Sequence, residues 1–79
     1  MPQYFFHLHN SGGWTRDAEG RDLPDLRAVE MVTLADVREL MASDIKAGDP
    51  VKLSSFIAVD DEKGEQVYKL VYSDAVSFI

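Results

Sequence analysis

Residues 23–50 read LPDLRAVEMVTLADVRELMASDIKAGDP, and this stretch decides the fold. It predicts a single amphipathic helix from Leu26 to Ala47. Asp25 suits the N-cap, because its carboxylate can accept from the free backbone N–H groups of the first turn. Gly48 suits the left-handed position after the last turn, and Pro50 disfavours helical backbone at the residue before it. The helix therefore has a defined start and a firm end.

At about 100° per residue, six residues of this helix share one face, which indicates that the helix buries one side. They are Leu26, Val29, Thr33, Val37, Leu40 and Met41. Glu30 and Asp44 lie within or beside this face, and a buried carboxylate is costly unless it is paired. One interpretation is a functional acid. The interpretation that we favour is that both lie near helix ends, where the apolar stripe reaches water.

Length and composition bound the class of protein. A chain of 79 residues has room for one domain, spanning 1–79, with one modest core. Cysteine is absent, which removes disulfides, thiolate catalysis and iron–sulfur clusters. The N-terminus has no basic region followed by a long apolar run, and no segment is long enough to span a bilayer. The expected location is the cytoplasm.

The charge pattern bears on the partners. The formal net charge is −6, and the basic residues are scattered without a Lys/Arg cluster or stripe. Binding to a phosphate backbone needs grouped cations, so neither nucleic acid nor an anionic membrane is expected as a direct partner. Acidity favours solubility, and a basic protein surface remains open as a partner.

Short strands are expected on both sides of the helix, which gives a ββαββ chain. Their ranges are Tyr4–His9, Trp14–Asp17, Leu53–Asp60 and Gln66–Tyr72. Each pair contains a turn of the form Asp-x-x-Gly, at residues 17–20 and 61–64, with Asp and Gly at favoured turn positions. The predicted fold class is α+β, one four-stranded sheet covered on one face by the single long helix.

The order of the strands leaves alternatives. With the strands numbered along the chain, the order 2-1-4-3 pairs the first and last strands in parallel at the centre, as in β-grasp folds. An all-antiparallel sheet requires the order 2-1-3-4 or 1-2-4-3. We favour the β-grasp-like order 2-1-4-3, because the aromatic-rich first strand and the last strand suit central, doubly covered positions.

Period two divides the first strand between the two faces of the sheet. Tyr4, Phe6 and Leu8 can meet the helix, whereas Phe5, His7 and His9 lie on the open face, with Trp14 near an edge. Aromatic residues on an open sheet face indicate a protein partner or a second subunit, and a homodimer is the simplest arrangement. The alternative is that the C-terminal segment, with Val76, Phe78 and Ile79, folds over this face and hides it.

His7 and His9 are also the strongest metal-ligand candidates, because they project from the same side of one strand. A third ligand would have to come from a remote acid such as Asp17 or Asp22. No H-x-x-x-H or Cys/His spacing supports a site, so surface histidines are the favoured interpretation and no metal or cofactor is predicted. The serines lie in no nucleophile elbow, and Gly12-Gly13 is not followed by Lys. No catalytic residue is assigned, and an enzyme is not expected.

Several short motifs occur together along the chain: Tyr4-Phe5-Phe6-His7, Asp17-x-Glu19-Gly20 and Leu23-Pro24-Asp25. In these motifs the chain resembles a family of small alphaproteobacterial proteins of unknown function. The resemblance extends from Tyr4 to about Val76; it weakens at residues 29–32, where related chains are richer in Ala. It implies a compact cytoplasmic domain and supplies no activity, ligand or catalytic residue.

The function expected from the sequence is a non-enzymatic protein-interaction or regulatory module that self-associates. The surface expected to carry it contains Phe5, His7, His9 and Trp14. The alternative is a metal-binding or small-ligand-binding protein that uses His7 and His9.

Overall fold

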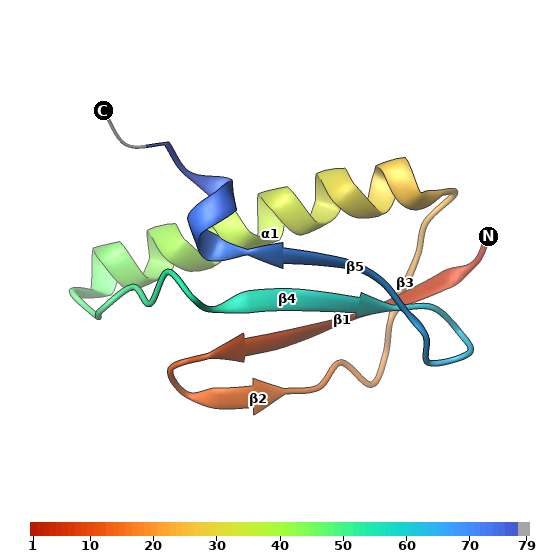
Figure 1. The fold of residues 1–79 in the computed structure, drawn as a ribbon, viewed down its shortest axis with the longest axis horizontal. Helices are drawn as coiled ribbons and strands as arrows, with labels where there is room; N and C mark the ends of the chain where they lie inside the picture. The colour runs from red at the N-terminus through yellow and green to blue at the C-terminus, as the bar shows by residue number, and fades with distance from the viewer. Residues whose placement is uncertain (78–79) are drawn as a thin grey trace.

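The computed structural model describes residues 1–77, which form one antiparallel sheet with a long helix across one face (Figure 1). The strands are β1 (Gln3–Asn10), β2 (Gly13–Thr15), β3 (Arg21–Asp22), β4 (Phe56–Asp60) and β5 (Gln66–Val71). The helix α1 spans Leu26–Ala47, and a 3-10 turn, η1, spans Tyr72–Ala75. The predicted α+β class, with the helix packed on the sheet, is confirmed.

The favoured strand order is wrong. The sheet has the order β2-β1-β4-β5 with every pairing antiparallel, which is the order 2-1-3-4 among the four predicted strands. The strand after the helix takes the central place beside β1, because its residues Ile57, Ala58 and Val59 are all buried. The last strand carries the exposed Lys69 and lies at the edge. An edge position suits a strand with a solvent-exposed charged residue better than a central one does.

The two-residue strand β3 was not predicted, because a segment this short has no periodicity to detect. It pairs with the start of β1 through Gln3↔Asp22 and Tyr4↔Arg21. The backbone N–H of Leu23 then donates to the carbonyl of Pro2 at 3.1 Å. These bonds hold the connection against β1 before the helix begins.

The helix begins and ends where the sequence predicts. The Asp25 carboxylate accepts from the Ala28 backbone N–H at 2.9 Å, and Gly48 follows the last turn with φ 76°. Its buried residues are Val29, Thr33, Val37 and Met41, all from the predicted stripe. Glu30 is exposed and Asp44 partly exposed, in agreement with the favoured interpretation of these two acids.

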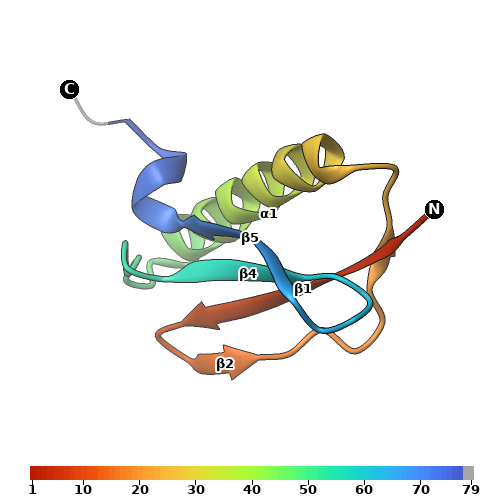
Figure 2. The same cartoon turned by 45° about the vertical axis from the view of Figure 1, so that its right-hand side comes forward.

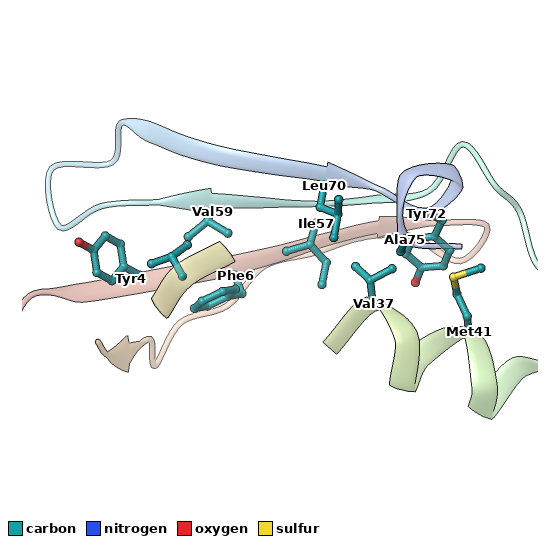
Figure 3. Close-up of a cluster of buried hydrophobic side chains, with 10 residues drawn as sticks. Tyr4, Phe6, Val37, Met41, Ile57, Val59, Leu70, Tyr72 and Ala75 are labelled. Carbon is teal, nitrogen blue, oxygen red and sulfur yellow. The ribbon is translucent and has the colours of Figure 1, made fainter. Parts of the chain in front are cut away.

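The core lies between α1, η1 and one face of the sheet (Figure 3). Val37 and Met41 of α1 point toward Tyr72 of η1, while β1 and β4 contribute the remaining large side chains. Burial raises the pKa of the Tyr72 hydroxyl, and the nearby carboxylate of Asp44 raises it further. Because Arg38 Nε donates to the Ala75 carbonyl at 3.2 Å, η1 is also tied to the helix by a hydrogen bond.

The C-terminal segment bears on whether the open face of the sheet is covered. Val76 packs against the core cluster. The other two residues of the predicted covering segment, Phe78 and Ile79, lie outside the described residues. Among residues 1–77, no helix combines the length and the apolar character needed to cross a membrane.

Candidate functional site

The sheet face turned away from α1 carries aromatic rings from three neighbouring strands. Figures 1 and 2 show α1 along one side of the sheet, with η1 beside it. On the other face, His9 of β1 lies directly opposite both Trp14 of β2 and Phe56 of β4. We call these three residues the aromatic patch.

The rings of the aromatic patch are in contact with one another. The His9 and Phe56 rings are stacked, with centroids 5.0 Å apart and planes 10° apart. The Trp14 ring lies tilted, 5.6 Å from His9 and 6.0 Å from Phe56. Cross-strand aromatic pairs of this kind stabilise a sheet, and here they also form a contiguous aromatic surface.

Two cations flank the patch. Lys69 Nζ lies 4.1 Å from the centroid of Phe56, and the guanidinium carbon of Arg16 lies 5.6 Å from the centroid of Trp14. Both distances are within the range of cation–π attraction. Two positive charges therefore border the patch, although the chain as a whole is acidic.

The four predicted surface residues differ in how far they are exposed. His9 and Trp14 are exposed and belong to the aromatic patch. Phe5 is half-buried, because its ring packs on Gly20: a Cβ atom at position 20 would lie 2.9 Å from Phe5 Cε2. His7 is buried. Phe56 was not among the predicted surface residues, since only the register between β1 and β4 brings it beside His9.

His7 of β1 contacts both the segment after β2 and the end of β4. Its Nδ1 accepts from the Asp17 backbone N–H at 3.0 Å, so the neutral ring carries its proton on Nε2. This Nε2 faces Asp60 Oδ2 at 3.2 Å. The imidazole thereby joins the end of β4 to the segment after β2, and both ring nitrogens are engaged within the chain.

Asp17 is the second half of this link. Its carboxylate accepts from the backbone N–H of Phe6 at 3.0 Å, and from those of Glu19 and Gly20 at 3.1 Å. Desolvation is the largest single influence and by itself raises the pKa of this carboxyl group. The three backbone donors and the neighbouring His7 together outweigh it, so the pKa lies below the ordinary value of 3.8.

This geometry bears on the alternative of a metal site. Within residues 1–77, no group of three or more His, Cys, Asp or Glu side chains is placed to hold a metal ion. His7 could bind a metal only by giving up a bond to Asp17 or Asp60. His9 is packed between two rings, and Asp22 lies in β3 at the other end of β1.

Among the hollows that residues 1–77 form, two lie beside α1 on the helix side of the sheet. The larger, about 700 Å³, lies between α1 and residues 15–21, and we call it the helix groove. The smaller, about 430 Å³, lies between α1 and β5 and is lined in part by Glu30, Tyr68 and Asp74. Burial raises the pKa of Tyr68, and the charges of those two acids raise it further.

The fold and this surface define a small α+β domain with a helix on one sheet face and an aromatic patch on the other. The chain belongs to the family described as a domain of unknown function, DUF6894, whose sequence profile matches residues 3–73. The predicted membership in a family of unknown function is confirmed at that level. No curated protein and no solved structure gives a significant match.

Proposed function

We propose that the protein is a non-enzymatic interaction module that self-associates through the open face of its sheet. The observation that carries this proposal is the aromatic patch, since His9 and Trp14 are exposed and Phe56 is only partly buried. An apolar patch bordered by charged groups is typical of a protein-interaction site. Aromatic side chains also dominate the binding energy of such surfaces.

The polar groups around the patch support an apolar contact. His7 and Asp60 engage each other, and the cations of Arg16 and Lys69 lie over rings. What the patch offers a partner is therefore mainly ring surface. A nucleic-acid partner is not favoured, because these two cations do not form a stripe that could follow a phosphate backbone.

Charge along the open face favours a second copy as the partner. Arg16 and Lys69 lie over the rings at the Phe56 end of β4, and the other end of β4 leads into the acidic segment 60–62. A second copy turned end for end would place unlike charges opposite each other. Such a two-fold arrangement presents the same surface from both subunits. We place this assembly in the cytoplasm.

Sedimentation equilibrium over a wide range of protein concentration tests the proposal. We expect the wild type to exceed one chain per particle, and Trp14→Ala to raise the dissociation constant about tenfold or more. Met31→Ala is the matched control, since Met31 is 64% exposed on α1. A wild type that remains monomeric at every concentration contradicts the proposal.

A second variant tests the charge arrangement. Lys69→Glu removes the cation over Phe56 and should dissociate the assembly. Lys46→Glu makes the same charge change on an exposed residue in the last turn of α1 and should leave association unchanged. Equal effects of the two substitutions would show that only the net charge matters.

A further inference from the structure

The helix groove exists because α1 covers only part of the sheet. The helix packs over β4, β5 and η1, whereas β2 is the labelled strand that lies farthest from it (Figure 2). The uncovered part of the sheet next to β2 therefore forms a recess beside the helix. This recess is open to solvent and has a volume of about 700 Å³.

The floor of the helix groove is apolar. It is formed by Phe6 and Leu8 of β1, Ile57 of β4 and Leu40 of α1. Phe6 and Ile57 belong to the core, but Leu8 and Leu40 are only partly buried. These two leucines offer apolar surface to a ligand that lies along the groove.

The rim of the groove carries more acid than base. Four acidic residues and two arginines line it, and the guanidinium group of one of them, Arg16, lies over Trp14. The Asp17 carboxylate is occupied by backbone donors, and Asp36 pairs with Arg21 at 2.7 Å. Within residues 1–77, Glu19 and Glu39 form no ion pair. Glu39 lies one helical turn beyond Asp36, and Ser43 lies one further turn along the same wall.

One cation of the chain already lies in this groove. The Arg21 guanidinium carbon is 4.8 Å from the centroid of the Phe6 ring, and its Nη2 is 2.7 Å from Asp36 Oδ2. The groove thus holds a planar cation between an aromatic face and a carboxylate. Part of this chemistry recurs at Glu39 and Ser43, which lie beside the two leucines. Within residues 1–77, no cation is paired with Glu39.

We infer that the helix groove binds an elongated organic cation, a guanidinium or ammonium group carried on an alkyl chain. Its charged group lies at Glu39 beside Ser43, and its chain lies along Leu8 and Leu40. The surplus of carboxylates on the rim attracts cations and repels anions. The residues proposed to hold the ligand, Glu39, Ser43, Leu8 and Leu40, are not part of the aromatic patch, so this site is distinct from the proposed self-association.

Titration of the ¹⁵N-labelled full chain with hexylguanidinium tests the inference. We expect saturable shifts of the amide resonances of Leu8, Leu40 and Ser43. Hexanoate has a chain of similar length with the opposite charge and should leave these resonances in place. The inference fails if hexylguanidinium gives no saturable shifts, or if hexanoate produces the same ones.

Two pairs of variants separate the groove from the charge of the whole molecule. Glu39→Gln should weaken hexylguanidinium binding about tenfold, since a charge-assisted bond is lost, whereas Glu30→Gln should not. Arg21→Ala frees Asp36 and should strengthen binding, whereas Arg27→Ala changes the net charge equally outside the groove. If the two variants of either pair change the affinity for hexylguanidinium equally, the inference is overturned.

A further titration identifies the source of the cation. A short peptide with blocked ends and a central arginine presents the same guanidinium on a polypeptide. Tighter binding of this peptide than of hexylguanidinium assigns the groove to an arginine side chain of a partner. Weaker binding assigns it to a free small molecule. If Glu39→Gln affects neither compound, the groove does not bind organic cations.

Discussion

The two faces of the sheet are built from the same strands but are held together by different forces. On the helix side, Phe6 and Val59 pack into a core closed by Val37 and Tyr72. On the open side, the only residue of β1 that is fully buried is His7, and its ring nitrogens are bonded to the chain. The helix side depends on apolar burial, and the open side depends on hydrogen bonds and ring contacts.

This difference teaches where function can be placed. A core face tolerates little change, because every side chain fills space that its neighbours define. The open face needs no such filling, since its strands are joined at their ends by the His7 link and its rings contact each other. In the proposed function, this outer surface meets the partner while the helix side maintains the fold.

The comparison is tested most strongly by neighbouring phenylalanines on opposite faces. Phe6→Ala should lower the free energy of unfolding by about 3–5 kcal/mol, as is typical of removing a buried ring. Phe5→Ala should cost clearly less, because Phe5 is half-buried on the open side. Urea unfolding followed by circular dichroism measures both, and equal losses would remove the distinction between the faces.

A glycine on the open side should give the next largest effect. Gly20 has φ +75°, and an added Cβ would lie 2.9 Å from the Phe5 ring. Gly20→Ala therefore combines backbone strain with a steric overlap and should cost about 2–3 kcal/mol. Gly64→Ala is the matched control, with φ +80° and no atom within 4 Å of the added Cβ. Thermal melts of the two variants should differ, with Gly20→Ala the less stable.

The His7 link predicts a smaller loss. His7→Ala leaves the Asp17 backbone N–H without its acceptor and should cost about 2 kcal/mol. His7→Asn offers an oxygen acceptor near the same place and should recover part of that loss. Hydrogen exchange at the Asp17 amide is the direct measurement. Unchanged protection in His7→Ala would mean that the link contributes nothing.

The smallest effect concerns pH. The pKa of Asp17 is lowered in the folded chain, so the stabilisation from its carboxylate is present above the ordinary value of 3.8 and is lost as pH falls below it. Between about pH 5 and pH 2, the wild type should lose more stability than Asp17→Asn. Urea unfolding midpoints measured at several pH values give the slope of stability against pH. Parallel slopes for the two proteins would show that protonation of this carboxylate does not contribute to the pH dependence of stability.

Local sequence signals predicted the features that local chemistry controls. The helix bounds follow from Asp25 and Gly48, whose capping roles depend on neighbouring residues alone. The alternation of β1 placed Phe6 toward the helix and His9 on the open face, because side chains of a strand alternate strictly. The resemblance to a family of unknown function was likewise predicted from the sequence, and the family match over residues 3–73 confirms it at that level.

The features that only the tertiary structure decided involve partners distant in the sequence. The place of β4 beside β1, the stacking of Phe56 on His9 and the bond from Asp17 to His7 all depend on how the strands are ordered and in which register they pair. No periodicity records which strand lies next to which. The sequence by itself therefore determined the elements and their faces, whereas the tertiary structure decided which residues meet on each face.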